Sequence, residues 1–357
     1  TDQDAKVEDI EQRCEELARR GAFIHRLAPA QWPDGTVATS YGFRHALHQQ
    51  ALYHEVPAAR RQRQHLRIGA RLEAAYHAQV SDIAPLLADH FERAHSPARA
   101  ADYRRQSGEA ALRRGAAREA ASQLRLALRL TMTAPDGPER TRAELQVLMS
   151  LGSALIVLEG FAAVDLPGIY GRVGALSEQL SDASTLIPAL CGLWNYHLTQ
   201  GELGLASGLA NRLAGLTKGR TGDDASMAAR NAAGVTDWLQ GDLTRALPHI
   251  DHVAGRYDLR QHAHLSTVFG EDPGIACHHY GAIVRQRLGA PDLAERHFQT
   301  GMEIAHTLDQ AFGVAQMLWS GAVIARERGE VALVRTRAEE LIRLCEAADT
   351  RFWLSGG

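Results

Sequence analysis

Glycines recur through the second half of the chain at a nearly constant spacing, and this spacing constrains the fold more than any other feature. The intervals are 41, 40, 48 and 40 residues along the series Gly160, Gly201, Gly241, Gly289 and Gly329. A fixed period of this size is typical of stacked supersecondary units. The alanine-rich segment 107–130 carries a related pair of glycines, Gly108 and Gly115.

Small and bulky residues keep fixed distances from these glycines. Ala120, Ala246 and Ala294 each follow a glycine by five residues, and Gly108 precedes Gly115 by seven. We interpret each unit as two antiparallel helices joined by a turn, where glycine accepts positive φ. The small residues would lie where helix axes cross, and a bulky residue nine after the glycine would fill the space between units. Trp194, seven before Gly201, fits the pattern less well.

The remaining sequence from residue 57 also favours helix. Alanine, leucine and arginine are abundant, and these residues have high helix propensity. We therefore predict helical repeats over 57–357. The one sizeable irregular stretch, 257–274, accounts for the 48-residue interval. An insertion of this kind in a solenoid maps to one face, which is often the binding face.

The first 56 residues have a different pattern. Residues 7–20 predict a helix, and Pro33-Asp34-Gly35 lies between two extended stretches, which indicates a hairpin. The segment beginning FRHAL is helical again. Helix, hairpin and helix within this length resemble a winged-helix domain, so we expect one over 1–56.

The repeat pattern, small–x6–Gly–x4–Ala–x3–bulky–x2–small, resembles the tetratricopeptide repeat. FRHALHQQALYHEVPAARRQRQHLRIGARLE, LADHFERAHSPARAADYRRQSGEAALRRGAAREA, ALIVLEGFAAV and GEDPGIACHHYGAIVRQRLGAPDLA, in this order, resemble large bacterial regulators with a STAND-type ATPase core. The resemblance implies a mainly α fold, a right-handed α-α superhelix preceded by a small winged-helix-like domain. It also implies an upstream ATPase domain that binds ATP or ADP, and a partner protein, peptide or small effector for the repeats.

The resemblance assigns one residue near the N-terminus. In STAND ATPases a winged-helix histidine can touch the phosphates of the bound nucleotide, and His45 takes that place here because it follows the hairpin at the start of a helix. The alternative is a buried structural histidine.

Several kinds of chemistry lack their motifs. The sequence has no GxxxxGK[ST], no G-x-S-x-G, no HExxH and no paired CxxC, so we expect no catalytic residue, metal or cofactor in this chain. A net charge of −3 argues against nucleic-acid binding over the whole surface. The four cysteines are far apart, which favours reduced thiols in the cytoplasm. The sequence contains no run of about 18 apolar residues, so it predicts no membrane span.

Aromatic residues on first helices of their units are candidates for ligand or partner contact. First helices usually line the inner surface of a solenoid, where aromatic side chains can grip a peptide or small ligand. Core packing is an equal alternative. The candidate contacts are Trp194, Tyr196, Trp238, His278 and Tyr280.

Three polar features have both a functional and an ordinary interpretation. His249 and His252 lie three apart on a helical face and could support a metal, or serve as ordinary polar residues. Asp272 before Pro273 predicts a helix N-cap, with a ligand-lining corner as the alternative. The basic run that starts at Arg60 could contact DNA, although a solvated helix face is more usual.

The sequence leaves three functions open. The first is a sensor and interaction region of a cytoplasmic ATP-dependent signalling or transcription regulator. The second is the regulatory region of a nucleotidyl cyclase, and the third is a stand-alone scaffold. The sequence also leaves an oligomer open.

Overall fold

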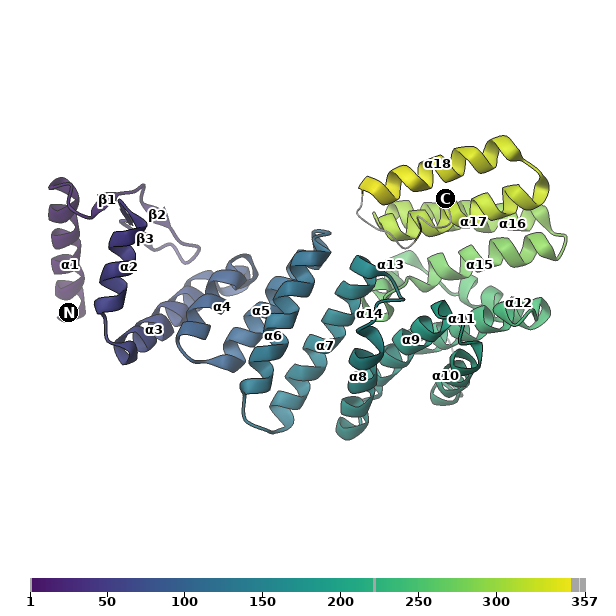
Figure 1. Ribbon diagram of the computed structural model, residues 1–357, viewed down its shortest axis with the longest axis horizontal. Helices are drawn as coiled ribbons and strands as arrows, with labels where there is room; N and C mark the ends of the chain where they lie inside the picture. The colour runs from purple at the N-terminus through teal and green to yellow at the C-terminus, as the bar shows by residue number, and fades with distance from the viewer. Residues whose placement is uncertain (1, 221–222, 348–352, 354–357) are drawn as a thin grey trace. The chain divides into compact units, whose positions relative to one another are not determined.

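The structure, a computed structural model, describes residues 2–220, 223–347 and 353. It is mainly α-helical, which confirms the expected fold class (Figure 1). The longer helices are α1 Asp2–Arg19, α2 Ala46–Glu55, α3 Ala58–Tyr76, α4 Ala84–Arg93, α5 Pro97–Arg113, α6 Ala117–Thr133, α7 Pro138–Glu159, α8 Leu166–Leu180, α9 Ala183–Thr199, α10 Leu203–Leu216, α11 Asp224–Leu239, α12 Leu243–Ala254, α15 Pro273–Arg287, α16 Pro291–Thr307, α17 Ala311–Arg328 and α18 Val331–Ala347. The short elements are β1 Ile24–Arg26, β2 Ala30–Gln31, β3 Val37–Ala38, β4 Tyr41–Phe43, the 3-10 helix η1 His77–Ile83, α13 Leu259–His262 and α14 Leu265–Phe269.

The described residues form two compact units. Residues 1–110 and 126–135 belong to unit 1, and residues 111–125 and 136–357 belong to unit 2. The winged-helix boundary at residue 56 lies inside unit 1 and stays a prediction.

The N-terminal part of unit 1 contains the predicted hairpin. β1 pairs with β4 and β2 with β3, both antiparallel. The turn between β2 and β3 is closed by a bond from the backbone N–H of Trp32 to the carbonyl of Thr36, 2.8 Å. Asp34 caps it by accepting from the Thr36 N–H at 2.9 Å and pairs with Arg71 at 2.7 Å. Local polar contacts thus hold a strand pair too short to be stable alone.

Helices α3 to α5 supply the apolar core of unit 1. Phe91 and Leu87 of α4 are fully buried. The Phe91 ring stacks on Tyr103 of α5, with centroids 5.7 Å apart. Gly69 of α3 admits this ring, because an added Cβ would lie 2.8 Å from the Phe91 Cζ atom.

Unit 2 consists of stacked helical hairpins. The pairs α9–α10, α11–α12, α15–α16 and α17–α18 each pack together, and each second helix also packs on the next first helix. The first helices α9, α11, α15 and α17 contact one another in succession. This arrangement is the one expected of a tetratricopeptide-like array.

The turns of these hairpins contain the glycines of the periodic series. Their φ angles are +74° at Gly201, +85° at Gly241, +78° at Gly289 and +75° at Gly329. Gly115, between α5 and α6, has φ of +77°. The alanines five residues further on are fully buried, namely Ala120, Ala206, Ala246 and Ala294. Gly108 is buried within α5.

One tyrosine of α8 shows how closely the helices of unit 2 approach. Tyr170 is 3 % exposed and lies between Gly152 of α7 and Gly192 of α9. An added Cβ would come within 2.8 Å of the ring at Gly152 and 2.4 Å at Gly192. Any larger residue at Gly192 would displace the ring.

The segment 257–274 is less irregular than predicted, since it contains the short helices α13 and α14. Leu265 of α14 is fully buried in the same apolar cluster as Trp194 and Met227. The insertion is therefore packed into unit 2.

Among the described helices, α7 alone is long and apolar enough to cross a membrane by length and composition. Half of the apolar 18-residue stretch of α7 is buried within the protein, and α7 packs on α8. The buried core helix of a protein can have the same length and apolar composition.

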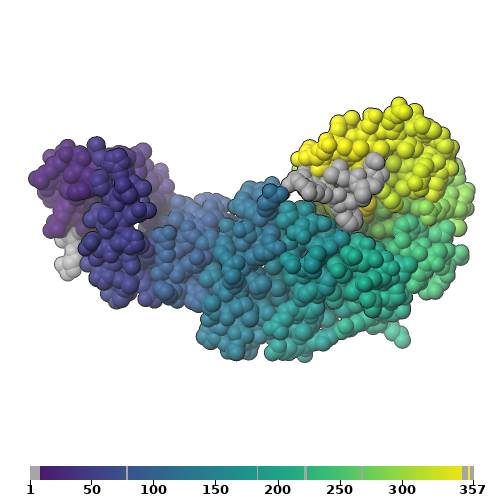
Figure 2. Space-filling model, in the orientation of Figure 1, coloured from purple at the N-terminus to yellow at the C-terminus, as the bar shows by residue number. Residues whose placement is uncertain are grey.

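The helix α18, coloured yellow in Figure 2, begins at Val331, which is 71 % exposed.

Candidate functional site

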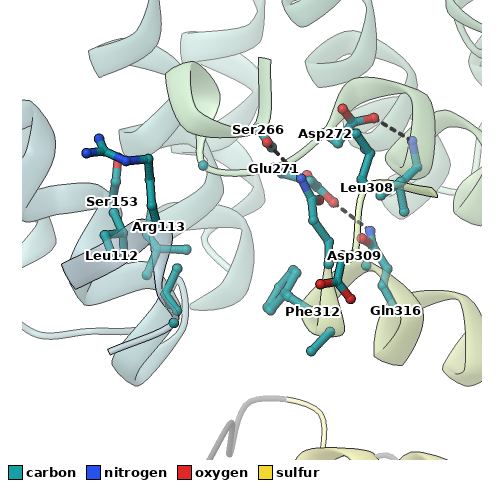
Figure 3. Close-up of a pocket in the computed structure, with 18 of the residues that line it drawn as sticks. Leu112, Arg113, Ser153, Ser266, Glu271, Asp272, Leu308, Asp309, Phe312 and Gln316 are labelled. Atoms are coloured by element: carbon teal, nitrogen blue, oxygen red, sulfur yellow. Dashed lines mark hydrogen bonds between the residues drawn. The ribbon is translucent and has the colours of Figure 1, made fainter. Parts of the chain in front are cut away.

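Unit 2 contains a partly open cavity of about 590 Å³ (Figure 3). This size suits a drug-sized ligand or the end of a peptide. Four segments that are distant in sequence line it: the α5–α6 turn, the C-terminal half of α7, the α14–α15 connection and the start of α17 with the preceding turn. The lining residues used below are Arg113, Arg114, Ser153, Ile156, Val157, Ser266, Gly270, Glu271, Asp272, Asp309, Gln310, Phe312 and Gln316.

The α14–α15 connection reaches the cavity through a tight backbone approach. Gly270 ends α14 with φ of +77°, and an added Cβ would lie 2.9 Å from Cδ1 of Ile156. Only glycine satisfies both the left-handed conformation and the close contact. The next two residues, Glu271 and Asp272, are thereby placed at the cavity wall.

Asp272 is both the N-cap of α15 and part of the cavity wall. One carboxylate oxygen accepts from the backbone N–H groups of Gly274 and Ile275 at 2.9 and 3.0 Å. The other accepts from the Tyr257 hydroxyl at 2.9 Å. The predicted cap is therefore present, and the side chain also lines the cavity. Burial raises the pKa of Asp272, although these hydrogen bonds oppose the shift.

Glu271 is the carboxylate with the most unusual environment. Its Oε1 atom accepts from the side-chain amide of Gln316 at 2.5 Å, and Gln316 is only 2 % exposed. Burial raises the pKa of Glu271 to about 7, and the neighbouring charge of Asp272 contributes to the increase. Within the described part of the chain, burial, Gln316 and Asp272 account for this shift, and no cation contributes to it.

The other walls mix apolar and charged groups. Ile156 and Val157 contribute an apolar surface from α7, and Phe312 contributes one from α17. Gln310 donates from its amide to the Ser266 hydroxyl at 2.8 Å, which ties α17 to α14. Figure 3 shows Arg113 on one side of the cavity and Glu271 with Gln316 on the other.

Trp194 fits the core-packing alternative. Its side chain is 2 % exposed, and its indole N–H donates to the Thr236 hydroxyl of α11 at 2.9 Å. It therefore packs between first helices, and its contact role stays a prediction. Sequence position on a first helix could not reveal this burial, because the neighbouring helix creates it.

The other candidate contact residues lie in different surroundings. Trp238 and Tyr280 are half-buried and face each other with ring centroids 5.0 Å apart. Tyr196 is half-buried, against His197. His278 is 9 % exposed, and its Nδ1 atom lies 3.0 Å from Nδ1 of His297. None of these residues lines the cavity, so their contact role stays a prediction.

His45 lies at the N-cap of α2 and makes no side-chain cap bond. It is exposed, so the buried alternative is wrong, and its ring meets His48 at 5.4 Å. Its role toward a nucleotide stays a prediction.

The histidine pair of α12 packs toward α11. The Cβ of His249 lies 3.0 Å from the position of a Cβ at Gly234, and its Nε2 lies 3.9 Å from Oδ2 of Asp237. In the described part of the chain, no three histidine, cysteine or acidic side chains are placed to hold a metal ion. In the basic run of α3, Arg60, Arg63 and Arg67 are exposed.

The fold and the cavity together define a tetratricopeptide-like helical repeat protein with a ligand-sized cavity. The architecture is similar to that in a crystal structure of a Rap protein complexed with Competence and Sporulation Factor. The two are 11 % identical with a TM-score of 0.53, over 86 % of this chain and 81 % of the Rap chain. At this identity the likeness shows the fold. No protein-family model matches the sequence, and no curated protein matches it.

Proposed function

We propose that this chain is a non-catalytic sensor region whose unit 2 binds a short peptide or small effector in the cavity. The main observation in support is that four segments distant in sequence meet around one cavity. A ligand there would contact several repeats at once and so bias their packing. A Rap protein of similar fold is complexed with Competence and Sporulation Factor, which supports binding by this architecture.

The cavity groups suit recognition better than bond cleavage. Ser153 donates its hydroxyl to the Met149 carbonyl at 3.2 Å, and Ser266 accepts from Gln310. Neither hydroxyl bonds to a histidine or carboxylate in the described structure, as an activated nucleophile would. Amide and carboxylate groups on an apolar background are typical of ligand pockets.

The test is to fill the cavity. We expect Ser153→Trp to block it, since the side chain lines the wall. The full chain is immobilised and exposed to a pool of random pentapeptides, and retained peptides are quantified by mass spectrometry. Wild type should retain a defined subset that Ser153→Trp loses, by about tenfold or more.

Ser122→Trp is the matched control, because Ser122 is exposed on α6 outside the cavity. It should retain the same subset as wild type. Equal retention by wild type and Ser153→Trp, or no retention by wild type, would refute peptide binding in the cavity.

We also propose, from the sequence resemblance, that the region belongs to a cytoplasmic regulator with an upstream ATPase module, which controls transcription or a nucleotidyl cyclase. The exposed imidazole of His45 is free to meet a nucleotide phosphate. A longer chain containing that module should bind ADP, and His45→Ala should weaken binding about tenfold. His54→Ala, exposed on the same helix, is the control. Unchanged ADP affinity in His45→Ala would remove this role.

A further inference from the structure

The cavity has an uneven distribution of charge. Glu271, Asp272 and Asp309 line the side formed by α15 and the α16–α17 turn. The lining cations, Arg113 and Arg114, belong to the α5–α6 turn, and Figure 3 shows Arg113 away from Glu271. Arg114 faces Glu119 at 3.8 Å. The cavity therefore has an acidic wall and a basic wall.

The carboxylates of the acidic wall differ in what they can still bind. Both carboxylate oxygens of Asp272 already accept hydrogen bonds, from the backbone N–H groups of Gly274 and Ile275 and from the Tyr257 hydroxyl. Asp309 is exposed to solvent, which weakens any pairing it makes. Glu271 receives a single amide donor at Oε1, so its second oxygen has no hydrogen-bond donor among the described side chains.

The protein therefore compensates the negative charge of Glu271 only in part. Glu271 is half-buried, and a carboxylate that is partly removed from water is costly unless a cation or several donors compensate it. Here the protein supplies one amide and places the negative charge of Asp272 beside it. An ammonium group that entered the cavity would supply both charge and hydrogen bonds.

We propose that Glu271 receives the free amino terminus of a peptide that binds in the cavity, a statement that rests on the proposed function. The adjoining groups suit the first peptide unit. Gln316 and Gln310 have side-chain carbonyls that can accept its N–H, and Arg113 on the opposite wall can meet carbonyl or carboxylate oxygens further along. The peptide thus enters with its amino end toward α15.

The expected pH dependence has a defined sign. The pKa of Glu271 in the free protein is raised to about 7, so its charged form grows as pH rises through neutrality. Asp272, Asp309, Arg113 and Arg114 are the other charged groups around the cavity. Burial, and then the charge of Glu271, raise the pKa of the Tyr280 hydroxyl. Binding of an ammonium should strengthen between about pH 5.5 and 7.5, below the usual pKa of a peptide amine. A neutral Glu271 that donated to a ligand carbonyl would show the opposite trend.

The experiment uses two pentapeptide pools without lysine, arginine or histidine, so that the α-amine is the sole cation. One pool is unblocked, and the other is N-acetylated. Immobilised wild-type chain should retain the unblocked subset about tenfold better than its acetylated counterparts at about pH 7.5. Glu271→Gln should reduce this preference to about onefold, and Glu303→Gln, exposed on α16, should keep it.

The outcomes separate the two proposals. Loss of retention in Ser153→Trp, with equal retention of both pools by wild type, would overturn the role of Glu271 and leave cavity binding intact. Retention that rises as pH falls would also overturn it. Retention that ignores Ser153→Trp would refute cavity binding itself. The comparison of the two pools and of the pH values uses the wild-type protein alone. It therefore tests the role of Glu271 even if the Glu271→Gln protein does not fold.

Discussion

The start of the chain and the repeats of unit 2 differ in how their helices are held. α2 has no buried residue, Leu47 is 75 % exposed, and its N-cap His45 makes no side-chain cap bond. α15 is buried along most of its length, and its N-cap Asp272 caps two backbone amides. Most helical stability in proteins comes from tertiary packing. We therefore expect substitutions at the helix contacts of unit 2 to lower stability strongly. Substitutions at exposed positions, including those of α2, should have little effect.

The largest effect should come from enlarging a residue at a helix crossing. Gly192→Val would place atoms against the Tyr170 ring, where even a Cβ lies only 2.4 Å away. We expect a loss of about 3 kcal/mol in the free energy of unfolding, since overpacked cores cannot relax fully. Urea unfolding followed by tryptophan fluorescence measures it.

Gly208→Ala is the matched control, because its added Cβ meets nothing within 4 Å on α10. It should raise stability by about 0.5 to 1 kcal/mol through helix propensity. A Gly192→Val protein as stable as wild type would mean that the crossings do not hold the array.

A smaller effect should separate the two N-caps. Asp272→Ala removes two amide caps and the acceptor of the Tyr257 hydroxyl, so we expect a loss of about 2 kcal/mol. His45→Ala removes no cap bond and should change stability by less than about 0.5 kcal/mol. The same urea titration compares them, and equal losses would contradict the contrast between the regions.

The repeat architecture was predictable because its signals are local. A turn that requires positive φ selects glycine, and a close helix crossing selects alanine, so Gly241 and Ala246 mark a hairpin without knowledge of its neighbours. Gly289 and Ala294 mark the hairpin of α15 and α16 for the same reason.

The cavity was not predictable, because its walls come from segments distant in sequence. Glu271 carries one local hint, its position beside Asp272 before a proline-started helix. Nothing local indicates that Gln316 bonds to it from α17. Trp194 shows the converse, since its sequence position suggested contact and its bond to the Thr236 hydroxyl favours core packing.

The turn glycines determine which chirality a residue that replaces them should have. Gly201, Gly241, Gly289 and Gly329 have no atom within 4 Å of an added Cβ, so space does not exclude a side chain there. The left-handed backbone is what disfavours residues with L chirality, at a cost of about 1 to 2 kcal/mol. A D-alanine introduced by chemical synthesis would fit these turns without strain, and it would restrict the unfolded chain where glycine leaves it free.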